Sequence, residues 1–342
     1  MTADTFKLSN FSPPRYLRNG HVQSVVSSLK FRRPLLRRRA KALIACAREH
    51  ILDCGDDVRL MGLHSAHPNP SNESRPLVVL LHGWEGHADS NYVLSLGSYL
   101  FGKGYDIFRL NFRDHGPTHH LNRDIFHSCR LPEVVGAVRA IQTLFKPSTM
   151  SLAGFSLGGN FALRVAAKAP QAGIKLRHAI AVCPVLHPKK TLAAMESGWF
   201  VYQRYFISKW KSSLRIKQKC FPEHFDFSNI LRMSSLNDMT DVMVRHHSEY
   251  PDMSTYLDGY AIVDDVLAEL TVDSHVILAE DDPIIPVHDV RFLAQTPHLK
   301  ITTVKHGGHC GFMDRLHSES WLDRNVAEIL GRNRDERDGR DA

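Results

Sequence analysis

A serine lies between two glycines at the junction of an apolar segment and a helix-forming segment. The sequence Gly-Phe-Ser-Leu-Gly occupies residues 154–158, directly after the apolar run 150–153 and before the segment 159–167, which has the composition of a helix. A sharp strand-to-helix turn requires small residues two positions before and after its central residue, because larger side chains would collide with the neighbouring strand or helix. We therefore predict that Ser156 lies on such a turn, in a strained backbone conformation with its hydroxyl group exposed.

Short apolar runs recur on both sides of this turn and alternate with segments of helical pattern. A hairpin is predicted over residues 50–63, with its turn at 55–57. The strands that follow it are predicted at 76–81, 105–110, 150–153, 178–183, 274–279 and 300–305. Such alternation is typical of an α/β fold with a mostly parallel central sheet and helices on both of its faces.

The length of the chain suits one large domain that carries an insertion. Of its 342 residues, 43% are hydrophobic, which is ample for a buried core. We predict a single domain over residues 1–330 that begins with an N-terminal arm, residues 1–45. The tail 331–342 mixes charges of both signs and is predicted to be disordered.

The alternation of strands and helices stops between about residue 184 and residue 261, where we predict a helical cap. Aromatic side chains recur there at helical spacing. We expect most of them to pack the cap onto the core and a minority to line an apolar pocket for an acyl chain. They are Trp199, Tyr202, Phe206 and Trp210, with Tyr205 beside them.

A nucleophilic serine needs a general base, and the base needs a carboxylate that orients it. The strand predicted at 274–279 runs into an acidic turn that contains Asp281 and Asp282. Catalytic groups of open α/β folds collect at such strand ends. A turn that leaves the strand through three residues before it presents its carboxylate favours Asp282, with Asp281 solvated, but either carboxylate remains a candidate.

The base is expected after the next strand. The strand predicted at 300–305 runs into His306 and His309. The two glycines that precede His309 give the backbone freedom to bring that imidazole over the serine turn, whereas His306 lies where the strand is still ending. His309 is therefore favoured, with His306 as the alternative, and the order serine, aspartate, histidine is the one expected for this type of turn.

A serine nucleophile also needs two N–H donors for the oxyanion that forms during acyl transfer. One is expected from Leu157, the residue after the serine, because its amide opens the predicted helix. The other is expected from the loop after the strand at 76–81, which has the pattern His-Gly-x-x-Gly at residues 82–86. Within this loop, Trp84 is the candidate donor.

These motifs together resemble those of the YheT-like predicted hydrolases of the α/β-hydrolase superfamily, which include abhydrolase-domain esterases and lipases and the medium-chain ethyl-ester synthases. Two motifs are specific to that family, namely Asn-Gly-His near the N-terminus and Gly-Gly-His near the end. The matching segments lie at residues 17–24, 81–92, 111–113, 153–160, 279–283 and 306–312. The segment 113–120 departs from the family pattern, because it is richer in charge and histidine.

Residue by residue, the resemblance makes Ser156 the nucleophile, His309 the base and Asp282 the orienting carboxylate. It implies the α/β-hydrolase fold and a serine hydrolase that cleaves carboxylic esters, with short to medium or lipid-like acyl chains, through an acyl-enzyme. Two rival functions use the same fold: transfer of the acyl group to an alcohol, and a non-catalytic binding protein.

The composition favours a soluble cytoplasmic enzyme with a small-molecule ester as its partner. No signal peptide is apparent, and no apolar run approaches the roughly 20 residues that cross a bilayer. The six cysteines show no paired spacing, as expected for free thiols in a reducing compartment. The net charge of +7 comes partly from the basic run 32–41, which we interpret first as a solvated helix, then as a peripheral membrane contact, and last as a nucleic-acid contact.

The chain contains 21 histidines, but their pattern predicts no metal site, and no cofactor motif is present. The adjacent pairs 119–120 and 246–247 point their side chains apart on any regular element. Neither a Cys-x-x-Cys motif nor a helical His-x-x-x-His motif with a partnering carboxylate occurs. We therefore expect these histidines to lie on the surface.

Overall fold

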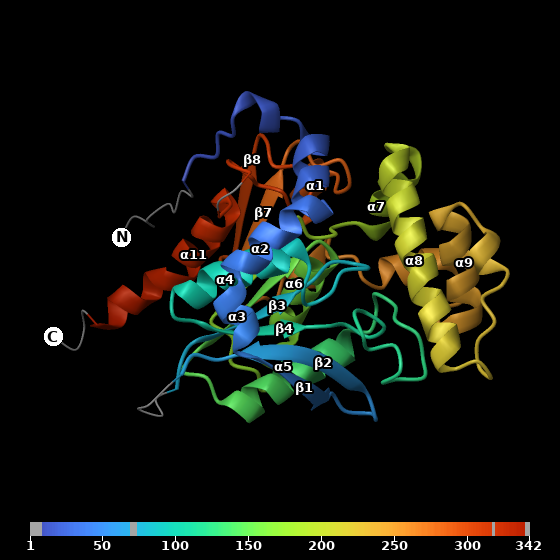
Figure 1. Ribbon diagram of the computed structural model, residues 1–342, viewed down its shortest axis with the longest axis horizontal. Coiled ribbons are helices and arrows are strands. Elements are labelled where there is room, and N and C mark those ends of the chain that lie inside the picture. The colour runs from blue at the N-terminus through green and yellow to red at the C-terminus, as the bar shows by residue number, and fades with distance from the viewer. Residues whose placement is uncertain (1–8, 69–73, 317–318, 339–342) are drawn as a thin grey trace.

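A computed structural model describes residues 9–68, 74–316 and 319–338. In these residues the central element is an eight-stranded sheet of order β1-β2-β4-β3-β5-β6-β7-β8 (Figure 1). The pairs β1·β2 and β2·β4 are antiparallel, and all other neighbouring strands are parallel. The strands are β1 (Ala47–Asp53), β2 (Arg59–Ser65), β3 (Leu77–Leu81), β4 (Asp106–Leu110), β5 (Met150–Phe155), β6 (His178–Val182), β7 (Asp273–Ala279) and β8 (Leu299–Val304).

This topology confirms the predicted hairpin, the six predicted strands and the mostly parallel sheet. Every residue of β3, β5 and β6 is buried. These strands occupy the middle of the sheet, where helices cover both faces, so their sequences are continuous apolar runs instead of alternating ones.

Helices cover the sheet in two groups. Helices α4 and α11 pack together, as do α5 and α6, and the N-terminal helices α2 and α3 pack on α4 (Figure 1). The helices of the arm and of the sheet layers are α1 (Gly20–Ser28), α2 (Arg33–Arg39), α3 (Lys41–Ala45), α4 (Asn91–Gly102), α5 (Leu131–Phe145), α6 (Leu157–Lys168) and α11 (Trp321–Asp338). Helix α11 thus extends through much of the segment after residue 330 for which the sequence favours disorder.

The segment between β6 and β7 forms a separate helical layer, α7 to α10, which stands to one side of the sheet (Figure 1). It has a hydrophobic cluster of its own, centred on Phe227, Leu236 and Met239, which are fully buried. We call this layer the cap. Its helices are α7 (Pro188–Ser197), α8 (Phe200–Cys220), α9 (Leu236–His247) and α10 (Met253–Asp258).

Short 3₁₀ helices occupy several connections. They are η1 (Arg15–Leu17), η2 (Lys30–Arg32), η3 (Ile230–Arg232), η4 (Asp265–Leu267) and η5 (Val287–Phe292). In the part of the chain that the structure describes, no helix combines the length and the apolar character that crossing a membrane would require.

Candidate active site

Ser156 lies on a sharp turn between β5 and α6, where the sequence places it. Its backbone has φ 54° and ψ −118°, a conformation that residues with a side chain rarely adopt. The glycines on either side are required by contact. A Cβ atom on Gly154 would lie 2.0 Å from the carbonyl oxygen of Gly158, and one on Gly158 would lie 2.4 Å from the carbonyl oxygens of Leu81 and His82.

The structure brings Asp282 and His309 together at the ends of β7 and β8. Nδ1 of His309 donates a hydrogen bond to Oδ2 of Asp282 at 2.9 Å. The other carboxylate oxygen accepts the backbone N–H groups of Ile284 and Ile285 at 2.8 and 3.0 Å. The carboxylate is therefore fully buried and held in one orientation.

The electrostatics of His309 follow from this contact. Burial by itself disfavours the imidazolium, but the carboxylate of Asp282 and, after it, the side chain of Cys310 together outweigh burial and raise the pKa of His309 well above its usual value. The carboxylate also fixes the tautomer of the neutral ring, with the proton on Nδ1 and the lone pair on Nε2. Such a ring can accept a proton at Nε2 and be stabilised as it does so.

The alternative pair, Asp281 and His306, is looser and lies outside the cavity that contains Ser156. Nδ1 of His306 is 3.7 Å from Oδ2 of Asp281. Asp281 is less solvated than the sequence suggests, since Oδ1 accepts the backbone N–H of Gly308 at 2.8 Å and burial raises the pKa of the carboxyl group. The prediction of a solvated Asp281 is therefore wrong: this side chain braces the loop that carries His309.

The N-terminal arm braces the same loop from the other side. The hydroxyl group of Ser24 accepts the backbone N–H of His309 at 2.8 Å and donates to the carbonyl oxygen of Gly20 at 2.6 Å. Gln23 is fully buried and pairs with both backbone groups of Met313. These supporting roles were not predicted for the arm, although the Asn-Gly-His motif of the family lies in this helix.

Glycine is required in that motif because the arm touches the acidic turn directly. A Cβ atom on Gly20 would lie 2.0 Å from the backbone oxygen of Asp281. The side chain of Asn19 caps α1 by accepting the N–H groups of His21 and Val22. The ring of His21 meets the cap, since its Nδ1 is 3.0 Å from the hydroxyl oxygen of Tyr202.

The loop after β3 lies beside the serine turn. A Cβ atom on Gly83 would lie 3.3 Å from Cβ of Ser156, and the N–H of Gly83 donates to the hydroxyl group of Tyr92 at 2.9 Å. The buried His82 donates through Nδ1 to Gly83 and accepts from Phe112 through Nε2, and burial keeps its pKa well below the usual value. His82 thus fixes the backbone just before Trp84, one of the two predicted oxyanion donors. The other predicted donor, Leu157, is the first residue of α6.

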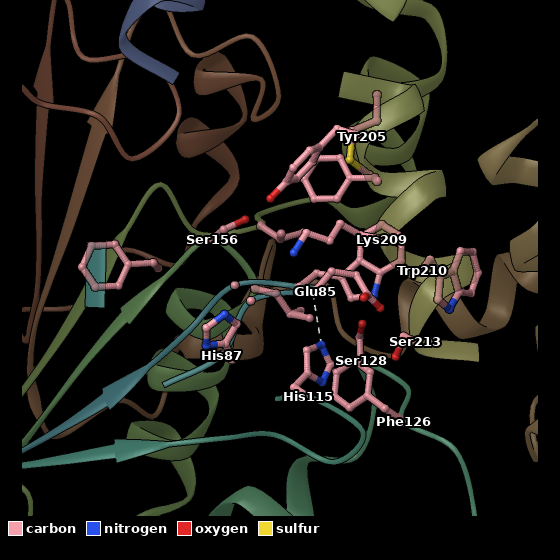
Figure 2. A pocket seen from close by; sticks show the side chains of 18 of the residues that line it. Glu85, His87, His115, Phe126, Ser128, Ser156, Tyr205, Lys209, Trp210 and Ser213 are labelled. Carbon is pink, nitrogen blue, oxygen red and sulfur yellow. Dashed lines mark hydrogen bonds between the residues drawn. The ribbon is translucent and has the colours of Figure 1, made fainter. Parts of the chain in front are cut away.

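Ser156 and His309 border one cavity of about 740 Å³ between the sheet edge and the cap. Its walls are mostly apolar, but two ionisable side chains, Glu85 and Lys209, reach into it near Ser156 (Figure 2). The N–H of Glu85 donates to Nε2 of His115 at 3.1 Å, and burial raises the pKa of the Glu85 carboxyl group to about 8. The arrangement suits a substrate that is largely apolar and carries a polar part near the reacting bond.

The aromatic residues of α8 divide between the two roles expected for them. Phe206 stacks on the ring of Trp84 with 5.4 Å between centroids, and Trp210 meets the same ring edge-on. Both line the cavity, as does Tyr205. Figure 2 shows Tyr205 and Trp210 at the cavity. Tyr202 packs instead against His21 of the arm and is outside the cavity lining.

The charge-rich segment after β4 forms buried ion pairs. Asp114 pairs with Lys217 of α8 at 2.8 Å, and both side chains are almost completely buried. Arg113 pairs with Glu133 of α5 at 2.8 Å. The charged residues by which segment 113–120 departs from the family pattern therefore include one that joins this loop to the cap by an ion pair, Asp114.

Two histidines in this segment, His115 and His119, were expected on the surface but are buried, as are His82, His127, His178 and His275 elsewhere in the chain. Nε2 of His119 lies 2.8 Å from the hydroxyl oxygen of Ser213 on α8, and only 4% of His119 is exposed. For His119, the expectation of a surface position was wrong because the cap covers this loop, a long-range contact that adjacent histidines do not reveal.

Residues 76–316 match the family model described as alpha/beta hydrolase fold, a span of more than half of the chain. The chain is 26% identical over 339 residues to the putative esterase YheT of Escherichia coli, covering 94% of this chain and 93% of that protein. It is 23% identical over 269 residues to the monoacylglycerol lipase ABHD2 of Danio rerio, covering 72% of this chain and 63% of that protein.

Solved structures share the fold at low sequence identity. The esterase Pf2001 of Pyrococcus furiosus superimposes with a TM-score of 0.54 at 15% identity, over 94% of this chain and 99% of that one. The 2,6-dihydroxy-pseudo-oxynicotine hydrolase gives a TM-score of 0.56 at 17% identity, over 88% and 74% of the two chains.

The family match and the similarity to the putative esterase YheT support hydrolase activity for this chain. The family match and the nearly full-length similarity to YheT also agree with the resemblance that the motifs carry. The chain therefore belongs to the alpha/beta hydrolase fold family, as a YheT-like member.

Proposed function

We propose that this protein is a serine hydrolase that cleaves carboxylic esters through an acyl-enzyme. The observation that supports this most is the 2.9 Å hydrogen bond from Nδ1 of His309 to the buried carboxylate of Asp282, beside a cavity that also contains the strained Ser156. A base with a fixed tautomer and a nucleophile on a sharp turn are the two parts that acyl transfer needs.

In the first half of the reaction, Oγ of Ser156 attacks the ester carbonyl carbon while Nε2 of His309 takes the hydroxyl proton. The amides of Leu157 and Trp84 receive the oxyanion. When the tetrahedral intermediate collapses, the imidazolium returns its proton to the departing alkoxide, and an alcohol leaves. Asp282 remains ionised throughout and stabilises the imidazolium.

In the second half, His309 removes a proton from a water molecule that attacks the acyl-serine. Collapse of the second intermediate releases the carboxylic acid and restores Ser156. Transfer of the acyl group to an alcohol would follow the same steps with the alcohol in place of water, so product analysis in the presence of ethanol separates the two reactions.

The substrate that the cavity favours has a short to medium or lipid-like acyl chain. Phe126, Met243 and Leu257 are among the apolar residues that line it. Each methylene group buried in such a wall is worth about 0.8 kcal/mol, so affinity should rise with chain length until the cavity is filled.

The first test is labelling with a fluorophosphonate, with the modified peptide identified by mass spectrometry. The second is the rate of hydrolysis of p-nitrophenyl esters with acyl chains of increasing length. We expect the label on Ser156 and saturable hydrolysis of the esters. A label on another serine, or no hydrolysis by a folded protein that labels normally, would contradict the proposal.

A further inference from the structure

Two buried cysteines lie next to His309, the proposed base, and the proposed reaction uses neither of them. Cys183 directly follows β6, and Cys310 directly follows His309. The two sulfur atoms and a ring nitrogen of His309 all lie within 4.8 Å of one another. Both cysteines are free thiols and both are buried.

The backbone bends unusually to make this cluster. Cys183 has φ 43° and Cys310 has φ 59°, both in the left-handed region that residues with a side chain rarely enter. At Cys310 this conformation lets the side chains of two successive residues, His309 and Cys310, approach the same point.

The backbone partners of the two thiol groups are weak, and their side-chain partners are the other members of the cluster, since Cys310 hydrogen-bonds to Cys183 and to His309. Sγ of Cys183 is 3.7 Å from the carbonyl oxygen of Gly308, and Sγ of Cys310 is 3.8 Å from that of Val182. Contacts of thiols with carbonyl groups at these distances contribute little, so a ligand that bonds to sulfur would displace only these contacts and the hydrogen bonds within the cluster itself.

We propose that Cys183, His309 and Cys310 form a binding site for a thiophilic divalent cation, with zinc as the representative ion. Two sulfur ligands and one imidazole are a donor set that zinc prefers, and three protein ligands leave one position for an exchangeable water molecule. On binding, the two thiols release their protons to solvent as the sulfur–metal bonds form, and no oxidation is involved.

The hydrogen bond to Asp282 decides which nitrogen binds the metal. Because Nδ1 of His309 donates to that carboxylate, the lone pair on Nε2 is the one available. A carboxylate on one ring nitrogen and a metal on the other is the usual arrangement around metal-bound histidine. Asp282 would therefore support metal binding with the same contact that supports catalysis.

The geometry needs only a small contraction. Ligands of a tetrahedral zinc ion with bonds of about 2.0 to 2.3 Å lie about 3.3 to 3.8 Å apart, and the two sulfur atoms and one ring nitrogen of His309 are at most 4.8 Å from one another. Entry is through the substrate cavity, because His309 and Cys310 both line it. Cys183 completes the site from behind, at the end of β6.

A metal ion at this position would block the reaction. It would occupy the lone pair of Nε2 that must accept the proton of Ser156, so the enzyme would be inhibited while the metal is bound. This inhibition rests on the proposed esterase function, whereas the binding of the metal does not.

Binding is tested first, without any need for activity, on the reduced Ser156→Ala protein. Equilibrium dialysis against zinc chloride should give one tight equivalent, and cadmium chloride should produce a thiolate-to-cadmium charge-transfer band in the ultraviolet. Cys183→Ala in the same background should lower the zinc affinity about 100-fold or more, beyond the roughly 10- to 100-fold that loss of an outer-shell partner costs. Cys54→Ala, which removes a buried thiol elsewhere, is the matched control and should bind as the parent does.

Activity is tested second, on proteins that retain Ser156. Zinc should inhibit ester hydrolysis, a chelator should restore it, and Cys183→Ala should hydrolyse esters but resist zinc. Equal zinc binding by the Cys183→Ala and Cys54→Ala proteins, or a cadmium complex without the charge-transfer band, would overturn the site. A protein that binds cadmium as described but never hydrolyses esters would retain the site and refute the proposed function instead.

Discussion

The cavity lies between the carboxyl ends of the parallel strands, here called the sheet edge, and the cap. The residues of these two regions are fixed in position by different kinds of contact. At the sheet edge, contacts between backbone atoms leave no room for change, as around Gly154 and Gly158, where an added Cβ would lie 2.0 to 2.4 Å from a carbonyl oxygen. The cap is attached by side chains, through the stacking of Phe206 on Trp84 and the buried pair of Lys217 with Asp114. The difference suggests that the chemistry belongs to the sheet and the choice of substrate to the cap.

The largest effect is expected from removal of the proposed nucleophile, which tests whether the chemistry belongs to the sheet edge. Ser156→Ala should abolish fluorophosphonate labelling and lower ester turnover by about three to six powers of ten, because nucleophile and base act as a unit. The measurement is labelling together with kcat on a p-nitrophenyl ester. Full labelling of the alanine variant would show that the nucleophile lies elsewhere.

The next effect concerns the two neighbouring carboxylates. Asp282→Asn should reduce turnover by about 10⁴, because it leaves the imidazole in the wrong tautomer. Asp281→Asn should stay within about tenfold of the parent, since an amide oxygen can still accept the N–H of Gly308. If Asp281→Asn proved the more damaging change, the assignment of the carboxylate would be reversed.

Comparison of the parent with Asp282→Asn also gives a pH profile whose direction of change can be predicted. Asp282 raises the pKa of His309, and only the neutral ring accepts a proton, so kcat/KM should rise with pH through a pKa above that of an ordinary imidazole. Asp282→Asn should move this acidic limb to lower pH, because the stabilising negative charge is gone. An unchanged limb would mean that another group controls it.

A smaller effect should separate the stability of the cap from the chemistry of the sheet edge. Lys217→Met leaves the Asp114 carboxylate buried without its partner and should cost about 3 to 5 kcal/mol in free energy of unfolding at neutral pH. Lys219→Met, at an exposed position of the same helix, is the control. Denaturant titration provides the measurement, and labelling of Ser156 should persist in the folded variant.

The pH dependence of that loss follows from burial. Burial raises the pKa of Asp114, and removal of Lys217 raises it further. Above the carboxyl pKa of the unfolded chain, the unfolded state gains stability by releasing a proton that the folded state keeps. The deficit of Lys217→Met should therefore shrink as the pH is lowered toward 5, and a deficit independent of pH would point to lost packing instead.

The smallest expected effect sharpens the role of the cap in substrate choice. Phe206→Ala enlarges the cavity and should shift the optimal length of the acyl chain by a few carbons. Tyr202→Ala should leave the optimal length unchanged, because Tyr202 contacts the arm and does not line the cavity. Profiles of kcat/KM against chain length decide this. A shift in the Tyr202 variant alone would place the acyl chain on the other side of α8.

Features encoded by adjacent residues could be predicted from the sequence. The strands, the serine turn and the acidic turn each depend on a run of fewer than ten residues, and the fold class follows from their order. The choice of Asp282 over Asp281 rested on a local turn as well, and the 2.9 Å contact with His309 agrees with it.

Contacts between distant segments could not be predicted in this way. The link from Ser24 to His309, the pairing of Lys217 with Asp114 and the approach of Cys183 to Cys310 each join segments about 100 to 285 residues apart. Buried charge looks like surface charge until the covering element is known, which is why His119 and the segment around it were misplaced. Cysteine spacing likewise gave no indication of a cluster whose members lie just after β6 and in the loop that follows β8.

The support of His309 by Ser24 has a consequence for the order in which the protein matures. The two residues are 285 positions apart, so the histidine loop is synthesised long after the helix that braces it. A chain synthesised only as far as the acidic turn after β7 would contain Ser156 and Asp282 but not the proposed base, and is expected to be inert toward esters at that stage. Closure of this one long-range contact is then the step at which a folding chain would become an enzyme, and contacts between such distant segments are the slow ones to form.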